Sequence, residues 1–128
     1  MIKILNLDIM KLNRKYDLIE DYREILSTNE DETEIDIEIH NKHFPNGFNF
    51  IVPQVYNGSI TLRDCKISKI STHVNHFKDD FRLVNCDIGE LELFGQWYKI
   101  VVIKNCIVRG KIIFTDSVFH RKVEFHKN

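Results

Sequence analysis

The sequence has few of the residues that interrupt regular structure. It contains only two prolines and five glycines in 128 residues, which excludes a disordered or linker-rich chain. No apolar run reaches the roughly 18 residues that a membrane span needs, and Lys, Asn and Asp interrupt the apolar residues at the N-terminus, unlike in a signal peptide. These absences predict a cytoplasmic protein with no membrane partner.

Motifs for catalysis and cofactor binding are also missing. The chain has no Gly-rich phosphate loop, no Gly-x-Ser-x-Gly elbow and no His-Glu-x-x-His. Its three cysteines lack the Cys-x-x-Cys spacing of zinc sites, and an odd number leaves no complete disulfide set. The pairs His40/His43 and His73/His76 have metal-like spacing, but no acidic or thiolate ligand converges on them. We therefore expect no catalytic residue, no cofactor and no metal, with reduced cysteines packed in the core.

Charge is distributed unevenly along the chain. Residues 1–40 hold five Lys/Arg against eleven Asp/Glu, a net charge of −6, whereas residues 41–128 hold thirteen against eight, a net charge of +5. The length allows one hydrophobic core and therefore one compact domain. We expect this domain to consist of an N-terminal cap, residues 1–40, and a repetitive part, residues 41–128.

An internal repeat decides the expected fold. Cys65, Cys86 and Cys106 stand in matching contexts, with spacings of 21 and 20 residues. Within that period, large apolar residues recur every five or six positions, and a second, mostly apolar or small residue lies two positions before each. An α-helix would need a period of 3.6 and a half-buried strand would need sustained alternation. Two inward residues in every five or six instead predict a coil of four short faces.

Stacking the coils aligns similar residues in columns. The large apolar columns are Tyr56, Phe77, Tyr98 and Phe119; Leu62, Leu83, Ile103 and Phe125; and Ile67, Ile88 and Val108. A polar column aligns Gln54, Asn75, Gln96 and Ser117, as expected if buried amides hydrogen-bond along the axis. Thr72 is the one residue that breaks the large apolar series. About four coils at ~4.8 Å each would form a rod roughly 19 Å tall.

The pattern resembles that of the pentapeptide-repeat family. The residues that carry the resemblance are Asp64-Cys65-Lys66-Ile67, Asn105-Cys106-Ile107-Val108 and the Phe-rich stretch from Phe114 to Phe125. The resemblance covers about residues 44–125. It implies a mainly-β fold, a right-handed, four-sided parallel β-helix, and no shared catalytic residues. It also implies dimerisation through the end of the coil.

The two ends of the coil are expected to differ. Ile2 and Ile4, followed by Leu7 and Ile9, suggest a strand, and residues 34–39 alternate as a half-buried strand. Between them, helical spacing is shown by Leu12, Tyr16, Ile19, Tyr22 and Leu26. These elements predict an α/β cap at the N-terminal end. We expect the last coil to be uncovered, with Phe119 and Phe125 available for self-association as a homodimer.

Two surfaces are candidates for binding a partner. Trp97 precedes the inward Tyr98 and Phe94 follows the inward Leu93, which predicts an exposed aromatic patch. On this register their neighbours are His76 and Val118 for Trp97, and His73 and Thr115 for Phe94. Exposed aromatic clusters often mark interaction sites. The alternative is a bulging corner folded back on the rod.

The second surface is acidic. On a strand, Glu34, Asp36 and Glu38 would project from one face about 6.8 Å apart, close to the spacing of phosphates in a nucleic-acid strand. Mimicry of nucleic acid and a simple solvated strand are the two interpretations of this row.

These features predict a non-enzymatic protein that binds another macromolecule. The most concrete hypothesis is a bacterial or phage-encoded inhibitor that occludes a nucleic-acid-handling enzyme, such as a topoisomerase or a CRISPR nuclease, through the acidic cap and the Phe94/Trp97 side. The alternative is a structural, self-assembling module whose coil ends stack into dimers or filaments. Direct binding of RNA or DNA is a third reading, for which the coil offers dispersed cations and no evident aromatic stacking platform.

Overall fold

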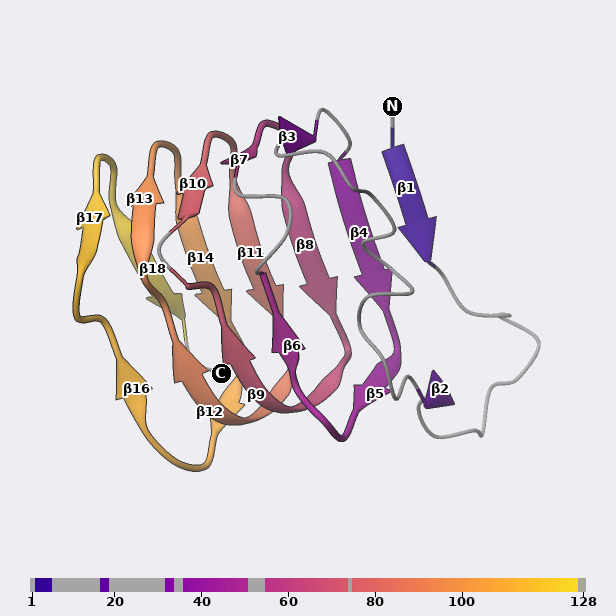
Figure 1. Ribbon diagram of the computed structural model, residues 1–128. Helices are drawn as coiled ribbons and strands as arrows, with labels where there is room; N and C mark the ends of the chain where they lie inside the picture. Colours follow the sequence, from indigo (N-terminus) through magenta and orange to yellow (C-terminus); the bar gives the residue numbers. More distant parts are fainter. Residues whose placement is uncertain are drawn as a thin grey trace.

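The computed structural model describes residues 2–5, 17–18, 32–33, 36–50, 55–73 and 75–126. All the regular elements in this part of the chain are β-strands, and every strand pair is parallel (Figure 1). Because parallel strands cannot be joined by a tight hairpin, each connection must carry the chain around to the next face. The result is a β-solenoid of about four coils.

The strands form three parallel sheets. The six-stranded sheet contains, in order, β1 (Ile2–Leu5), β4 (Asp36–His40), β8 (Ile60–Arg63), β11 (Phe81–Val84), β14 (Val101–Lys104) and β18 (Val123–His126). The five-stranded sheet contains β17 (Ser117–Phe119), β13 (Gly95–Trp97), β10 (Asn75–Phe77), β7 (Val55–Tyr56) and β3 (Glu32–Thr33). The seven-stranded sheet contains β15 (Ile107–Val108), β12 (Asp87–Glu92), β9 (Lys66–Ser71), β5 (Lys42–Phe44) and β2 (Asp17–Leu18), with β6 (Phe48–Asn49) paired to β9 and β16 (Ile112–Ile113) paired to β12.

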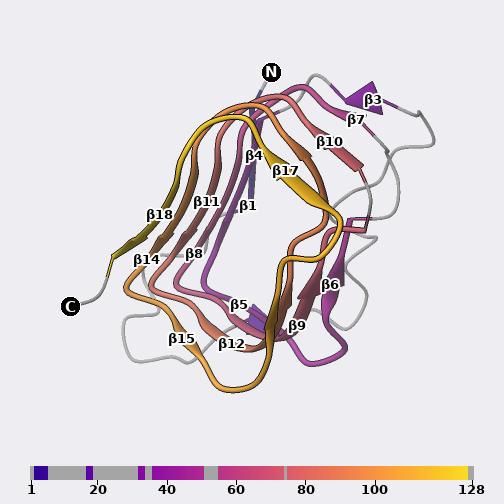
Figure 2. The same cartoon turned by 90° about the vertical axis from the view of Figure 1, so that its left-hand side faces the viewer.

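The seven-stranded sheet supplies two of the four sides. The first half of β9 pairs with β5 and the second half with β6, and β12 pairs in the same way with β15 and β16. Viewed from the C-terminal end, the chain runs counterclockwise as it advances toward the viewer (Figure 2). The coil is therefore right-handed, and the prediction of a right-handed, four-sided parallel β-helix is confirmed.

Most of the expected columns fill the core. Ile39, Leu62, Leu83, Ile103 and Phe125 are register partners along the six-stranded sheet. Phe44, Ile67, Ile88 and Val108 are partners along the seven-stranded sheet. In the first three coils these side chains are almost completely buried. Two inward residues per face therefore hold the four sides together, as the repeat predicted.

Each coil turns from the six-stranded to the seven-stranded sheet at an Asn or Asp in the left-handed backbone region. The four residues, with φ between 54° and 57°, are Asn41, Asp64, Asn85 and Asn105. Asn and Asp accept this conformation more readily than other non-glycine residues, because their short side chains hydrogen-bond locally. The acid or amide that precedes each repeat cysteine is thus the residue that makes the corner.

The cysteines after these corners are free, and each thiol donates to a carbonyl of the preceding coil. The acceptors are Ile39 O for Cys65 (3.7 Å), Leu62 O for Cys86 (3.4 Å) and Leu83 O for Cys106 (3.3 Å). The hydrogen bond with Cys106 lowers the pKa of Cys86, but its bond with Cys65 and its burial outweigh this and raise it to about 12. The hydrogen bond with Cys86 and burial also raise the pKa of Cys106, so both thiols stay protonated at neutral pH. The prediction of core cysteines is confirmed for the buried Cys65 and Cys86, whereas Cys106 in the last coil is half-buried and packs against the core.

The expected N-terminal cap is described only in part. β1 and β4 confirm strands in the predicted places, and β4 alternates between the half-buried Asp36 and Glu38 and the buried Ile37 and Ile39. The helix expected from residue 12 to about residue 27 is wrong at Asp17 and Leu18, because these two residues form β2 and pair in parallel with β5. The other predicted helix positions, Leu12, Tyr16, Ile19, Tyr22 and Leu26, lie outside the described residues, as do Leu7 and Ile9.

One column differs from the prediction. Tyr56, Phe77, Trp97 and Phe119 are register partners, so the inward aromatic residue of the third coil is Trp97 and not Tyr98. The polar column likewise contains Asn75, Gly95 and Ser117 instead of Gln96, whereas Gln54 lies outside the described residues. The expected 21-residue spacing is wrong here because the third coil is one residue shorter at the corner between Leu93 and Gly95.

Gly95 makes this short corner possible. Its φ is +102°, and a Cβ placed there would overlap the carbonyl oxygen of Asn75 in the coil below. Only glycine combines this dihedral with so close an approach of two backbones.

Replacing Gly95 with alanine should destabilise the protein by at least about 2 kcal/mol, because the strained dihedral and the overlap with Asn75 act together. Urea unfolding followed by circular dichroism would measure the change. Thr115→Ala is the matched control, since Thr115 is exposed at the same corner one coil later. Equal stability of the two variants would contradict the role given to Gly95.

Candidate functional site

Trp97 is a core residue and not part of a surface. It is 1% exposed and stacks on Phe77 with ring centroids 4.0 Å apart and planes 5° apart. Phe81 contacts it edge-on at 5.0 Å, and Phe119 lies on its other side at 6.0 Å. The expectation that Trp97 faces outward is therefore wrong, since the one-residue deletion before Gly95 turns it inward.

Phe94 lies at the short corner and is half-buried. Its backbone N–H donates to the hydroxyl of Thr72 at 2.6 Å, and that hydroxyl donates to the carbonyl of Phe94 at 2.9 Å. Thr72 is fully buried, so the residue that broke the apolar series is the one that ties two coils together here. His73 is exposed at this corner with a φ of +52°. The structure thus separates Phe94 and His73 from the buried Trp97.

The outward face of the five-stranded sheet carries a column of rings that the repeat pattern does not predict. Tyr98 stacks on His120 with centroids 4.6 Å apart, and the ammonium of Lys78 lies 3.9 Å from the centroid of the Tyr98 ring. His76 lies beside Tyr98, with its Nδ1 3.4 Å from the phenolic oxygen. The side-chain oxygen of Gln96 accepts a hydrogen bond from Nε2 of His120 at 2.9 Å. The fixed 21-residue spacing places Tyr98 inward and therefore does not predict this column. Gly95 is the residue that could have corrected the spacing.

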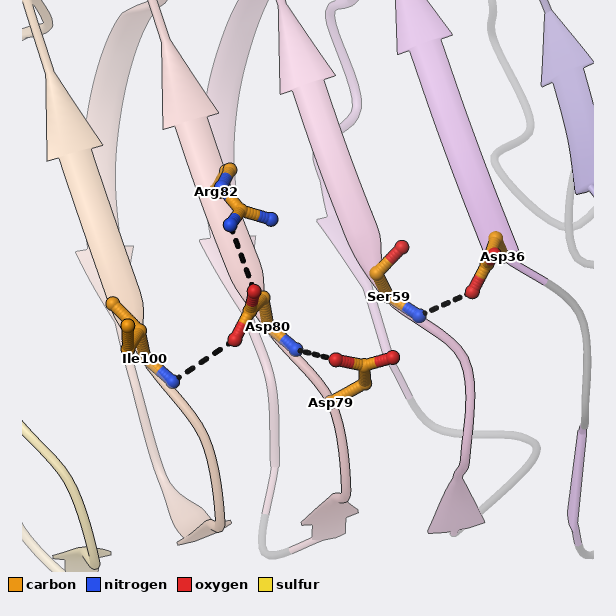
Figure 3. Close-up of polar contacts among 6 residues, drawn as sticks. All are labelled: Asp36, Ser59, Asp79, Asp80, Arg82 and Ile100. Carbon is orange, nitrogen blue, oxygen red and sulfur yellow. Dashed lines mark hydrogen bonds and ion pairs between the residues drawn. The ribbon is translucent and has the colours of Figure 1, made fainter.

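The acidic residues of the second predicted surface do not form a free row. Glu34 lies outside the described residues, and Glu38 is half-buried on the outward side of β4. The carboxylate of Asp36 accepts a hydrogen bond from the backbone N–H of Ser59 in the next coil at 2.7 Å (Figure 3). The carboxylate of Asp36 therefore stabilises the fold. It bonds to the next coil one residue before the hydrogen-bonded ladder between β4 and β8 begins.

Asp80 repeats this arrangement two coils later. Its Oδ1 accepts from the backbone N–H of Ile100 at 3.2 Å, and its Oδ2 accepts from Arg82 at 2.7 Å. Asp79 accepts from the N–H of Asp80 at 2.7 Å, so the carboxylates at this corner point at donors from the protein itself (Figure 3). A cluster satisfied in this way holds coils together and is not arranged for a ligand.

A shallow hollow of about 230 Å³ lies on the outward side of β9 and β12, lined among others by His43, Lys66, Asp87 and Arg109. Arg109 donates two hydrogen bonds of 2.8 Å to the carboxylate of Asp87. These bonds hold the pKa of Asp87 below its usual range, with a smaller contribution from the charge of Lys66. Asp87 therefore already supplies the negative charge that Arg109 and Lys66 attract.

The described residues include no group of three or more His, Cys, Asp or Glu side chains placed to hold a metal ion. In the same part of the chain, no helix has the length and hydropathy to cross a membrane.

Among the described residues, most of the exposed large apolar side chains lie in the last coil. Its exposed side chains include Ile107 (57% exposed), Ile112, Phe114 and Phe125 (53%). Phe114 contacts Phe119 and Phe125 edge-on, with centroids 6.0 Å apart in both pairs. Phe119 is half-buried in the same cluster. Phe119 and Phe125, the two predicted self-association residues, therefore lie together at one end of the rod.

Comparisons with known proteins identify no relative. No protein-family model matches the sequence, and neither the curated proteins nor the solved structures give a match.

Replacing Trp97 with alanine should cost about 3–5 kcal/mol of unfolding free energy, because it removes a large side chain from a packed aromatic stack. Tyr98→Ala is the matched control and should cost much less, since Tyr98 lies on the outward face. Urea unfolding of both variants would measure the difference. A larger loss for Tyr98→Ala would show that the predicted column was right and the observed one wrong.

Proposed function

We propose that this protein is a non-enzymatic, self-associating β-solenoid module, in which the last coil of one copy packs against the last coil of a second copy. The observation that carries the proposal is the uncovered apolar end formed by Ile112, Phe114, Phe119 and Phe125. An apolar patch of this kind on a folded domain is typical of an interaction surface.

The shape of this end favours a second coil as the partner. β15, β16, β17 and β18 are the outermost strands of the three sheets, so their outer backbone groups have no neighbouring strand among the described residues. A partner must offer strands on all four sides at once and an apolar centre. A single inserted strand or helix would cover one side only, whereas another coil of the same chain matches all four.

A closed dimer, instead of a filament, is the assembly that this end favours. Two identical apolar ends that meet about a two-fold axis form a self-complementary contact and close the assembly, whereas head-to-tail stacking would continue without limit.

A relationship to the pentapeptide-repeat family is part of the same proposal. It is supported by the four-sided parallel solenoid and by the pairs of inward residues on each face, such as Cys65 with Ile67 and Cys86 with Ile88.

The inhibitor hypothesis stays a prediction of the sequence. Of its two surfaces, Phe94, His73, His76 and Glu38 keep some exposure, whereas Trp97 is buried and Asp36 is bonded to Ser59. The geometry therefore supports self-association better than occlusion of a nucleic-acid-handling enzyme.

Analytical ultracentrifugation tests the proposal. The wild-type protein should sediment as a dimer, and Phe125→Glu should weaken the dimer by about 30-fold, because it places a charge at the centre of an apolar contact. Leu18→Glu is the matched control, since Leu18 has a similar exposure of 55% but lies on β2 near the other end. It should leave the dimer intact.

Thermal unfolding of each variant would check that the fold is retained. A wild-type protein that stays monomeric, or a dimer that Leu18→Glu weakens as much as Phe125→Glu does, would show that the last coil is not the contact.

A further inference from the structure

The apolar end of the last coil is surrounded by charges of mainly one sign. Residues 101–126 hold five Lys/Arg, which are Lys104, Arg109, Lys111, Arg121 and Lys122, against Asp116 and Glu124. Arg109 is neutralised by Asp87 of the preceding coil. The remaining four cations and two carboxylates leave a net charge of +2 around this end when its histidines are neutral.

Two of the six histidines belong to the same coil. His120 follows β17 and His126 ends β18, and both are exposed. We propose that His120 and His126 make the self-association of this module sensitive to pH, so that acid separates the two copies. This inference rests on the proposed function, because it names the regulation of that same contact.

The surroundings of His126 do not cancel its added charge. Glu124 on the same strand lies 3.2 Å from its Nε2, but that carboxylate already has Lys122 at 3.9 Å. On the neighbouring strand β14, the register partner of His126 is Lys104. When His126 is protonated, three positive charges, those of His126, Lys104 and Lys122, therefore surround the single carboxylate of Glu124.

His120 packs against the ring of Tyr98 and the amide of Gln96. Its ring stacks on Tyr98, whose ring also has the ammonium of Lys78 near its centroid, and its Nε2 meets the side-chain oxygen of Gln96. Arg121 follows it in the chain, and Asp116 lies just before β17. None of the ion pairs formed by the described residues involves His120, so its protonation adds a full positive charge to the end.

Protonation of both histidines doubles the net charge of each end from +2 to +4. In a two-fold contact the two ends face one another, so each added charge meets charges of its own sign across the interface. Histidine is the side chain that normally changes charge between pH 8 and 5. Acid should therefore weaken the contact without unfolding either copy.

Salt distinguishes this repulsion from other effects of acid. The screening length is about 30 Å at 0.01 M salt and about 3 Å at 1 M. Repulsion between two ends should act fully in dilute salt and largely disappear in concentrated salt, whereas the apolar contact persists.

The dimer dissociation constant should be measured by ultracentrifugation at about pH 7.5 and about pH 5.5, each in dilute and concentrated salt. We expect it to rise by at least about tenfold on acidification in dilute salt, and by much less at about 1 M. The double variant His120→Gln/His126→Gln should keep the dimer at the higher pH and lose the pH dependence. Circular dichroism at both pH values would confirm that the fold is retained.

His40→Gln is the matched control, because His40 lies in the same register column as His126 but four coils away. It should keep the full pH dependence. A dimer whose affinity is the same at both pH values, or a double variant that still dissociates in acid, would overturn this inference and leave the proposed function standing. A wild-type protein that is monomeric at both pH values would overturn both.

Discussion

In-register hydrogen bonding between successive coils is the constraint on which the rest of this structure depends. Each residue of a face pairs with its equivalent one coil before and one coil after, as Arg82 does with Thr61 and Val102. The backbone path of one coil must therefore be repeated by the next, including the left-handed corner at Asn41, Asp64 and its equivalents. A coil that departed from this path would leave backbone groups of two neighbours unpaired.

Polar side chains act where the strand ladders are interrupted. Asp36 and Asp80 accept backbone N–H groups from the following coil, Thr72 exchanges hydrogen bonds with Phe94, and Cys86 donates to the carbonyl of Leu62. Each of these bonds connects two adjacent coils at a corner. These bonds explain why the protein buries polar residues although its described residues form no metal-binding group. The buried side chains form hydrogen bonds with backbone N–H and carbonyl groups.

The sequence predicts the repeat well because burial repeats with it. The Leu62 and Ile67 columns follow from their spacing alone, since each face places two side chains in the core. A fixed period cannot show a corner that is one residue shorter, so the prediction fails for Trp97 and Tyr98, and with them for the exposed patch. Gly95 carries that information, but its meaning depends on the carbonyl of Asn75 in the neighbouring coil. In the same way, Asp36 looks like a surface acid until Ser59 is placed beside it.

A stacked repeat has no internal reason to stop, so its two ends must be closed by different means. Residues 1–40 carry a net charge of −6 and the last coil is positive, so the long-range attraction between copies favours head-to-tail stacking. That attraction is screened beyond about 8 Å at physiological salt. At contact distance, burial of apolar surface outweighs this screened attraction. The exposed Ile112, Phe114 and Phe125 therefore favour the two-fold contact that we propose between the last coils, in spite of their like charge.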